Sequence, residues 1–451
     1  MVFSSVEFLL YFFPVFMILY GITPKCMKNF ALLVGSLIFY ALGEPKYLIL
    51  LTISVVVNFF VGLHLQPVRG NRKSRQKKRK MILTAAVAGN VCYLAFFKGG
   101  ISEAGLPLGI SFYTFQILSY LIDVYRGTIK RERSLLRLAT YITMFPQLVS
   151  GPIVTYGEVE DALTERKMTA EGMQEGLKVF IIGLVSKVLI ADRIGLLWQE
   201  VQVAVFESIS TPMAWLGAIA YSMKIYFDFC GYSLMASGLG RMLGFTFPAN
   251  FRMPYMAGSV REFYRRWHIT LGRWFREYVY IPLGGNRNGE LRTILNLLAV
   301  WILTSLWHGS TPNFLIWGIL LWFFIVIERQ LDKIGMFKKL RVIPHLYLWA
   351  VIPVTWMCFA ISDISQLQIY LGRMFGIVEG INVRAADWKT ALENYGSLFA
   401  VSFLCCTPFV RNVHKKWKNN LVYMLVLAAL FWVCVWRLTL EGDNPFMYFR
   451  F

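Results

Sequence analysis

The length and number of the apolar runs in this chain limit the folds it can adopt more than any other feature. About 20 apolar residues of α-helix are needed to cross a hydrocarbon core of about 30 Å. Runs approaching that length recur along the whole sequence and predict roughly ten to twelve membrane segments. The candidate segments are 8–22, 30–42, 47–65, 81–97, 108–124, 177–198, 213–228, 294–307, 313–327, 346–361, 398–410 and 421–436.

The composition also indicates a membrane protein. Of the 451 residues, 57% are hydrophobic and only 16% are charged, which is unusual for a soluble domain. No repeat period, low-complexity tract or linker rich in Pro, Gly and Ser marks off a second domain. We therefore expect an all-α integral membrane protein in which residues 1–451 form a single polytopic domain, with some broken, re-entrant or interfacial helices.

The formal net charge of +20 is concentrated in particular loops. The sharpest basic cluster is QPVRGNRKSRQKKRK at 66–80, directly after an apolar run. Positive loops stay on the cytoplasmic side of a membrane, so this cluster predicts the inside face, and alternation of the loops before it predicts an outside N-terminus. Contact with anionic membrane lipid explains the cluster more simply than nucleic-acid binding does, so nucleic acid is not an expected partner.

Several familiar chemistries have no support in the sequence. The seven cysteines lie mostly inside apolar runs and lack CxxC or Cys/His spacing, so no metal site is predicted. The GxSxG, Walker and HExxH motifs of serine hydrolases, ATPases and metalloproteases are missing as well.

Ionisable residues inside the apolar runs are costly in lipid and each needs an explanation. Lys224 and Asp228 are four residues apart, so on a helix they share one face and are expected to neutralise each other. Lys187 and Asp192 are five residues apart and align less well, which predicts that one or both have partners elsewhere. All four are interpreted as architectural; the less favoured alternatives are a catalytic role for Lys224 and Asp228 and a role in a cavity for Lys187 and Asp192.

The segment 260–287, VREFYRRWHITLGRWFREYVYIPLGGNR, is too charged to span a membrane, yet it is rich in aromatic residues. Read as one helix, it has two polar sides, formed by Arg261, Arg265, His268 and Gly272 and by Arg266, Arg273 and Arg276. An interfacial anchor is the simpler interpretation. The alternative is a basic wall that binds a polyphosphate, because arginine forks match phosphate oxygens. The GGNRNG turn that follows is not a phosphate-binding fingerprint.

The stretch LTSLWHGSTPNFLIWG at 303–318 places a histidine, His308, between two apolar runs. Each run has about 14 or 15 residues, near 21 Å of helix, so neither comfortably crosses a bilayer. Gly309 and Pro312 predict a backbone break between them. Irregular backbone at membrane depth is tolerated only inside protein or beside water, so we expect His308 to face an interior cavity instead of lipid.

A buried histidine is often only a hydrogen-bonded structural residue, but its pKa near 6.5 also suits proton transfer. The break, the glycine and a second histidine, His268, in the aromatic and basic segment favour a functional site. Interrupted apolar segments also form substrate sites in transporters, so a transporter of an acyl group or an anionic solute, with His308 as a binding or gating residue, stays an alternative.

Taken together, several motifs resemble the membrane-bound O-acyltransferases, in particular the bacterial branch that acetylates alginate and other polysaccharides. The motifs occur in the family's order: LPLGISFYTFQILSYLIDVYRG, FPQLVSGPIV, GLVSKVLIADRI, YFDFCGYSLMASGLGRMLGFTFPANF, REFYRRWHITLGRWFREYVYIPLGGNR, LWHGSTPNFLIWG and NPFMYFRF. The resemblance covers the chain from its first apolar runs to Phe451.

The resemblance implies a helical acyltransferase around a central funnel, in the bacterial cytoplasmic membrane. It implies His308 and His268 as the two characteristic histidines, and acetyl-CoA or a similar thioester as donor substrate, with no bound cofactor. The acetyl group would cross the membrane to hydroxyls of an exported polysaccharide or cell-wall glycan, through a partner such as an extracytoplasmic acetyltransferase or a glycan-export protein.

The resulting hypothesis makes His308 the general base for the acceptor hydroxyl, while His268 orients a substrate or hydrogen-bonds the developing charge. Arg265, Arg266, Arg273 and Arg276 would hold the phosphates of CoA at the cytoplasmic face. A non-catalytic scaffold for glycan export is a third alternative.

Overall fold

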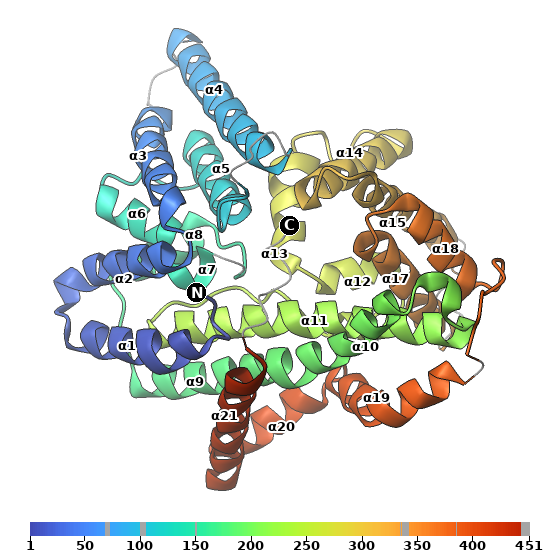
Figure 1. Cartoon of the computed structure of the whole chain (residues 1–451). Coiled ribbons are helices and arrows are strands. Elements are labelled where there is room, and N and C mark those ends of the chain that lie inside the picture. Colours follow the sequence, from blue (N-terminus) through green and yellow to red (C-terminus); the bar gives the residue numbers. More distant parts are fainter. Residues whose placement is uncertain are drawn as a thin grey trace. The chain divides into compact units, whose positions relative to one another are not determined.

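The computed structural model describes residues 1–67, 73–99, 105–148, 151–333, 335, 342–384 and 386–442. Throughout these ranges every regular element is helical, as Figure 1 shows, so the expected all-α class is confirmed. Contacts divide the chain into two compact units, one formed by Met1–Gly183, Tyr232–Pro248 and Val435–Phe451 and the other by Leu184–Gly231 and Ala249–Cys434. The assignment of 1–451 to one domain stays a prediction.

The first unit contains the N-terminal helices. They are η1 (Glu7–Phe12), α1 (Phe13–Ile22), η2 (Lys25–Met27), α2 (Lys28–Gly43), η3 (Pro45–Tyr47), α3 (Leu48–Leu65), α4 (Lys73–Lys98), α5 (Ile110–Arg126), α6 (Leu135–Thr143), α7 (Phe145–Leu148), α8 (Tyr156–Thr164) and nearly all of α9 (Ala170–Val185). Within this unit α3, α4 and α5 pack against one another.

The second unit contains both predicted histidines. Its helices are η4 (Ser186–Ala191), α10 (Asp192–Val203), η5 (Phe206–Ser208), η6 (Pro254–Met256), α12 (Val260–Arg266), α13 (Ile269–Phe275), η7 (Arg276–Tyr280), α14 (Glu290–His308), α15 (Pro312–Lys333), α17 (Ile343–Ala360), α18 (Ile364–Met374), α19 (Asp387–Cys405) and α20 (Phe409–Trp417). Two further helices, α11 (Thr211–Met242) and α21 (Leu421–Glu441), contribute residues to both units.

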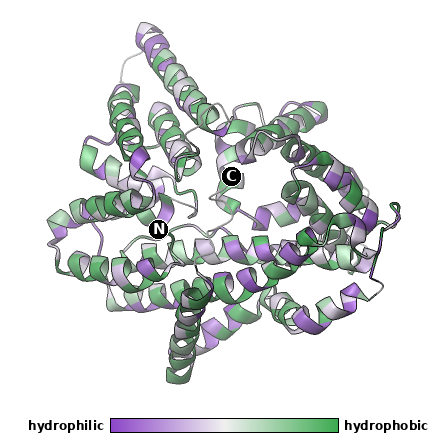
Figure 2. Cartoon of the chain, viewed as in Figure 1, coloured by the Kyte–Doolittle hydropathy of each residue, from purple (hydrophilic) through white to green (hydrophobic). Residues whose placement is uncertain are grey.

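Within the described ranges, seven helices are long and apolar enough to cross a membrane, and an eighth span results if α19 and α20, bent by 67°, count as one. This number is smaller than the ten to twelve expected, although the chain is polytopic as predicted. The other expected segments are helical too, but they are shorter, as in Glu7–Ile22, or carry several charges, as in α11. Figure 2 shows how hydrophobic residues dominate most of these helices.

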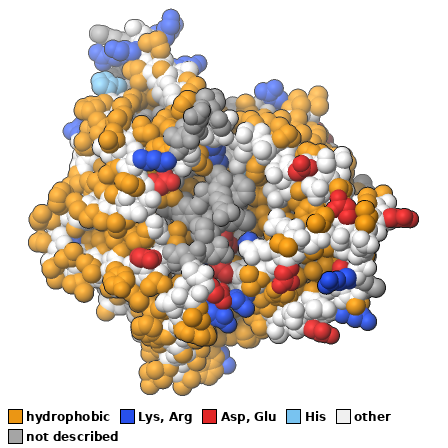
Figure 3. All heavy atoms as spheres, viewed as in Figure 1, with side chains coloured by type: hydrophobic (Ala, Val, Ile, Leu, Met, Phe, Trp, Pro, Cys, Tyr) orange, Lys and Arg blue, Asp and Glu red, His pale blue; other side chains and the backbone are white. Residues whose placement is uncertain are grey.

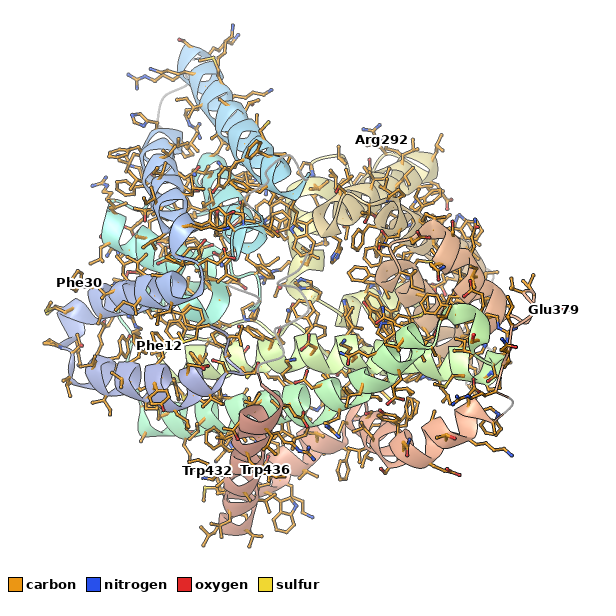
Figure 4. The ribbon with its side chains drawn as sticks, in the orientation of Figure 1. Phe12, Phe30, Arg292, Glu379, Trp432 and Trp436 are labelled. Atoms are coloured by element: carbon orange, nitrogen blue, oxygen red, sulfur yellow. The ribbon has the colours of Figure 1, made fainter. Side chains whose placement is uncertain are left out.

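The side chains that point outward are largely apolar, as Figure 3 shows for one face. Figure 4 marks three of them, Phe30 on α2 and Trp432 and Trp436 on α21. Half or more of each side chain is exposed, at 50%, 61% and 55%. Apolar surface of this extent suits contact with lipid.

The basic cluster predicted at 66–80 falls partly outside the described residues, since 68–72 are not described. From Lys73 onward the cluster is helical and forms the first turns of α4, whose other residues are mostly apolar. Side chains of Lys73, Lys77 and Lys78 are exposed. The cytoplasmic location of the first turns of α4 and the location of the N-terminus of the chain on the outside of the membrane stay predictions.

A buried ion cluster in the second unit confirms that Lys187 has a partner elsewhere in the chain. Nζ of Lys187 lies 2.5 Å from Oδ1 of Asp192 and 3.0 Å from Oδ1 of Asp228. The pair predicted between Lys224 and Asp228 stays a prediction. Lys187 also reaches Asp192 because η4 is a π-helix, in which residues five apart share a face. Lys187 and Asp192, poorly aligned on an α-helix, are therefore well aligned here.

Candidate active site

His308 is the last residue of α14, and its side chain is only 4% exposed. The predicted break follows it: Gly309 is extended and α15 begins at Pro312. A Cβ at position 309 would lie 2.3 Å from the ring of Phe314, so the close approach of this ring requires glycine. The burial predicted for His308 is confirmed.

The lengths predicted for the two flanking helices were wrong. The helices α14 and α15 have 19 and 22 residues, and each is long enough to cross a membrane. The apolar runs ended at charged residues, but both helices continue through them, from Glu290 in α14 and as far as Lys333 in α15. His308 therefore lies at the end of a full-length helix that packs against α15, not in the middle of a broken span.

Aromatic rings surround the imidazole of His308. The ring centroids of Trp307, Trp317 and Phe359 lie 4.7, 5.1 and 5.1 Å from that of His308, all in edge-to-face geometry, and Phe314 stacks at 6.3 Å. These rings come from α14, α15 and α17, so three helices fix the position of the imidazole. A largely apolar setting of this kind excludes water and strengthens electrostatic effects on a reacting group.

Asn313 ties two of these helices together. Its Nδ2 donates to the carbonyl oxygens of Cys358 at 3.1 Å and Phe359 at 3.4 Å. Because both partners can only accept, this side of the amide must be the NH₂ group. The link joins the start of α15 to the end of α17 and holds Phe359 beside His308.

His268 lies between α12 and α13 in left-handed backbone conformation, with φ at 45°. Its side chain is 3% exposed, and Nδ1 lies 3.0 Å from Oδ1 of Asn250. The same oxygen accepts from the backbone N–H and the hydroxyl of Thr270, at 3.4 and 2.9 Å, which identifies it as an acceptor. A left-handed non-glycine residue costs energy and is common at functional sites.

The contact with Asn250 determines the protonation of His268. Since Oδ1 of Asn250 accepts, Nδ1 of His268 must carry the proton, and Nε2 then holds the lone pair. Burial lowers the pKa of His268 to about 3, so the ring is neutral at physiological pH. Nε2 is buried and has no hydrogen-bond partner among the described residues. It can accept a hydrogen bond but cannot donate one.

The two predicted histidines belong to one cluster. The ring of Trp307 contacts both of them, with centroid distances of 6.2 Å to His268 and 4.7 Å to His308. The sequence could not predict Trp307 as the residue between them, because 40 residues of intervening chain separate the two motifs.

An arginine-rich pocket of about 730 Å³ lies beside this cluster in the same unit. Its lining includes six arginines: Arg261, Arg265, Arg273, Arg276, Arg287 and Arg329. Three of the four arginines predicted as phosphate ligands, Arg265, Arg273 and Arg276, are thus brought together. The fourth, Arg266, is bonded to Glu262 and does not belong to the lining.

The single helix assumed for the basic segment was wrong, and this explains which arginines meet. The helix α12 ends at Arg266, His268 reverses the backbone, and α13 and the π-helix η7 follow. Arginines assigned to opposite sides of one helix therefore line one pocket. Arg329 belongs to α15 and was missed because no sequence pattern connects it to this segment. The turn at 284–287, which lacks a phosphate-binding fingerprint in the sequence, contributes Arg287 to the lining of the pocket.

The charges in the pocket are only partly neutralised. Arg261 pairs with Asp332, Arg276 with Glu277, and Arg329 with Glu290. By contrast, Arg265 and Arg287 form no ion pair with a carboxylate of the described residues. Burial, together with repulsion from Arg265, lowers the pKa of Arg261. A pocket with crowded positive charge would gain from binding an anion.

The pocket adjoins the histidine cluster through two residues of its lining, Tyr264 and Ile269. The ring of Tyr264 lies 4.9 Å from that of Trp301 and 6.5 Å from that of Trp317. Ile269 directly follows His268 in the chain. Neither histidine itself belongs to the lining of this pocket, and the cavity expected beside His308 stays a prediction.

The fold and the site define a class of protein: an all-helical, multi-pass membrane protein with two buried histidines beside a cationic pocket. Comparison with known proteins identifies the family. Residues 126–364, more than half of the chain, match the MBOAT, membrane-bound O-acyltransferase family. The chain belongs to this family and is an O-acyltransferase.

The individual relatives act on carbohydrate polymers according to their names. The chain is similar to the probable alginate O-acetylase AlgI of Pseudomonas putida, with 32% identity over 500 residues that cover 100% of both chains. It is similar to the protein of the same name in Azotobacter vinelandii, with 36% identity over 418 residues, 88% of this chain and 81% of the relative. The peptidoglycan O-acetyltransferase of Helicobacter pylori is 32% identical over 428 residues, 84% of this chain and 80% of the relative.

Proposed function

We propose that the chain transfers an acetyl group from acetyl-CoA, bound on the cytoplasmic side of a bacterial cytoplasmic membrane, to hydroxyls of an exported polysaccharide or cell-wall glycan. The names of the relatives support an acetyl group and a glycan acceptor. Because the donor is cytoplasmic and the glycan is exported, a partner protein that carries or receives the acetyl group outside the membrane completes the proposal.

The position of Tyr264 is the observation that carries the proposal. Tyr264 lines the arginine pocket and also lies beside Trp317, one of the rings around His308, and beside Trp301, which packs on Trp317. A molecule with phosphates at one end and a reactive acyl group at the other fits such a site, because the arginines bind the phosphates while a flexible arm extends toward the histidines. Acetyl-CoA has this construction.

The proposed reaction begins with His308 as general base. His308 takes the proton of the acceptor hydroxyl while the hydroxyl oxygen attacks the carbonyl carbon of the thioester, giving a tetrahedral oxyanion. The carbonyl then re-forms, the carbon–sulfur bond breaks, and the departing thiolate takes the proton from His308. The products are the acetyl ester and CoA, and His308 returns to its neutral form.

His268 takes a positioning role in this mechanism. Its Nε2 lacks a proton, so it accepts a hydrogen bond from a neighbouring hydroxyl of the acceptor or from an amide N–H of the donor's arm. Stabilisation of the developing negative charge, the other role predicted for His268, requires a donor, and the neutral tautomer excludes it.

The proposal is tested by acetyl transfer from radiolabelled acetyl-CoA in purified protein reconstituted in nanodiscs, with alginate oligosaccharides and peptidoglycan fragments as acceptors. His308→Ala removes the general base and is expected to lower the rate by roughly 10²–10⁴-fold. His64→Ala is the matched control, because His64 bonds only to the carbonyl of Phe60 in its own helix and is exposed. Near-normal transfer by His308→Ala would overturn the catalytic assignment.

The donor site is tested separately. Arg265→Gln and Arg287→Gln should each raise KM for acetyl-CoA more than KM for acetyl-pantetheine, which lacks the phosphates. Arg292→Gln is the control, since Arg292 points away from the protein at the start of α14 (Figure 4) and does not line the pocket. An equal effect of all three substitutions would contradict a phosphate site. Passage of a labelled anionic solute into liposomes without thioester cleavage would favour the transporter alternative.

A further inference from the structure

Acyl transfer needs a hydrogen-bond donor for the oxyanion, and the two histidines do not supply one. His308 receives a proton in the proposed reaction, and His268 presents an unprotonated Nε2. An oxyanion that forms in an apolar, water-poor site requires a preorganised N–H or O–H close to the carbonyl. A candidate for this donor lies on the face of α15 that contacts His308.

Trp317 lies on this face and has a buried donor. Its side chain is 2% exposed, and its ring meets the ring of His308 edge to face at 5.1 Å. The indole Nε1–H has no hydrogen-bond partner among the described residues. A buried donor left without an acceptor costs about 1–3 kcal/mol, so an acceptor from a bound molecule would be favoured there.

Three other tryptophans of the same unit have hydrogen-bonded indoles. Trp356 donates to the hydroxyl of Tyr255 at 3.3 Å, Trp322 to the carbonyl of Ile294 at 3.1 Å, and Trp215 to that of Met374 at 2.8 Å. Trp356 also stacks on Trp317, at 6.1 Å and 20°. The bare N–H of Trp317 is therefore not explained by its aromatic surroundings.

An independent polar group marks the same face of the helix. Asn313 is one turn before Trp317, and its Oδ1 is likewise buried without a partner among the described residues. Its Nδ2 is occupied by the carbonyls of α17, so the oxygen is held in one orientation. A donor and an acceptor four residues apart on one face of α15 provide complementary hydrogen-bonding groups for a polar ligand. Trp317 packs on His308 directly, and Asn313 bonds to the backbone of Phe359, whose ring also packs on His308.

The position of Trp317 is also rigidly fixed. Next to it, Gly318 lets α15 approach α14 so closely that a Cβ would lie 3.0 Å from the carbonyl oxygen of Trp301. The ring itself is held by Trp301, Trp356 and Phe359, at 5.8, 6.1 and 5.3 Å. An indole N–H cannot rotate independently of its ring, so a fixed ring gives a preorganised donor.

We propose that Trp317 is a further catalytic residue, whose indole N–H donates a hydrogen bond to the thioester carbonyl oxygen and to the oxyanion that forms from it. Asn313 is a positioning residue: its oxygen accepts an N–H or O–H of the bound substrates, and its NH₂ group keeps Phe359 in place. This inference rests on the proposed function, because it presupposes that the acyl group reacts beside His308.

The test compares Trp317→Phe, which removes the N–H and keeps an aromatic ring, with Trp215→Phe, which removes an indole that donates to the carbonyl of Met374 and does not contact the site. In the nanodisc assay, Trp317→Phe should lower kcat by about 10²-fold, as expected for one lost oxyanion donor, and raise KM for acetyl-CoA by a smaller factor, because the ground-state carbonyl is a weaker acceptor than the oxyanion. Trp215→Phe should keep kcat. Thermal unfolding of both variants shows whether either substitution disturbs the fold.

A binding measurement tests the hydrogen bond from Trp317 to the thioester carbonyl oxygen separately from catalysis. S-ethyl-CoA replaces the acetyl group by an ethyl group and has no carbonyl for Trp317 to bind. Calorimetry should show weaker binding of acetyl-CoA to the Trp317→Phe protein and unchanged binding of S-ethyl-CoA. Equal losses for both ligands, or an unchanged kcat, would overturn the role of Trp317.

The two proposals fail in different ways. If His308→Ala is inactive while Trp317→Phe has a normal kcat, acyl transfer beside His308 stands and only the oxyanion donor is wrong. If His308→Ala is fully active, the catalytic assignment of His308 is wrong, and the role of Trp317 beside it falls as well. If the wild-type protein, supplied with its partner protein, releases no CoA with any acceptor, the proposed function itself is wrong.

Discussion

Nδ1 of His268 lies 3.0 Å from Oδ1 of Asn250, and this contact determines which ring nitrogen carries the proton. The amide oxygen accepts, so the other ring nitrogen, Nε2, is an acceptor, and the ring lies beside Trp307, which also contacts His308. The site thus combines the proposed general base with a second imidazole that only accepts hydrogen bonds. This division of roles follows from one neighbouring amide.

The buried neutral state of His268 predicts how the stability of the protein depends on pH. Burial lowers the pKa of His268 to about 3, whereas in the unfolded chain it is near 6.5. Between these values the unfolded chain binds a proton that the folded protein does not, so stability should fall as the pH drops below about 6.5. Part of this acid destabilisation should disappear in His268→Gln, which does not titrate.

The measurement is the thermal unfolding midpoint in detergent at several values between about pH 7 and pH 4. His64→Gln serves as the control, because His64 is exposed. If the unfolding midpoints of His268→Gln and the wild type fell in parallel as the pH is lowered, His268 would already bind a proton in the folded protein, and the prediction would be wrong.

The ion cluster in the second unit predicts a large effect of removing the cation that two carboxylates share. Lys187→Met leaves Asp192 and Asp228 without the amine that now pairs with both. Breaking a buried ion pair from one side costs about 3–5 kcal/mol, so the unfolding midpoint should fall strongly. At the exposed pair with Glu290, Lys333→Met should change the unfolding midpoint little, because solvent screens the two charges. Similar midpoints for both variants would contradict the assigned burial.

Glu328 on α15 is predicted to set the donor site without touching the substrate. Its carboxylate accepts from the backbone N–H groups of Val260 at 2.5 Å and Arg261 at 2.9 Å, so it caps the first turn of α12. That helix carries Arg261 and Arg265 of the pocket. Loss of the cap in Glu328→Ala should displace these arginines and raise KM for acetyl-CoA by about tenfold, equivalent to roughly 1.4 kcal/mol.

Steady-state kinetics can separate this positioning role from a general loss of structure. Glu328→Gln keeps one acceptor oxygen and should recover most of the lost affinity, while kcat should change little in either variant. Exposed Glu393 on α19 provides the control, as Glu393→Ala. A fall in kcat with unchanged KM would show that Glu328 acts on the chemistry instead.

The sequence predicted the helical class and the two histidines because both depend on local patterns. Apolar runs reveal helices, and Gly309 and Pro312 reveal where one ends. It predicted the lengths of α14 and α15 incorrectly because apolar runs stop at charges, whereas helices continue through them. It could not predict that Arg329 joins Arg265, because that contact depends on how α15 packs against α12.

Local backbone geometry caused the remaining differences. A π-helix at Ser186–Ala191 aligns Lys187 with Asp192, and a left-handed residue at His268 divides the basic segment into two helices. Neither feature has a dependable signature in a single sequence, since both require tertiary packing to offset their cost. In both places the sequence singled out the residues but not the backbone geometry that positions them.

Close contact between α14 and α15 leads to the last prediction. A Cβ added at Gly318 would lie 1.9 Å from Oγ of Ser305 and 3.0 Å from the carbonyl oxygen of Trp301. Gly318→Ala should therefore separate the two helices, destabilise the protein by about 1–3 kcal/mol and lower kcat, because His308 and Trp317 lie on opposite sides of this contact. Adding Ser305→Ala removes the nearest atom and should restore part of both losses.

At Gly396 on α19, where a Cβ would meet nothing within 4 Å, alanine should stabilise the helix by up to about 1 kcal/mol. Opposite shifts of the two unfolding midpoints, with activity lost only at position 318, would support this packing; equal shifts would contradict it.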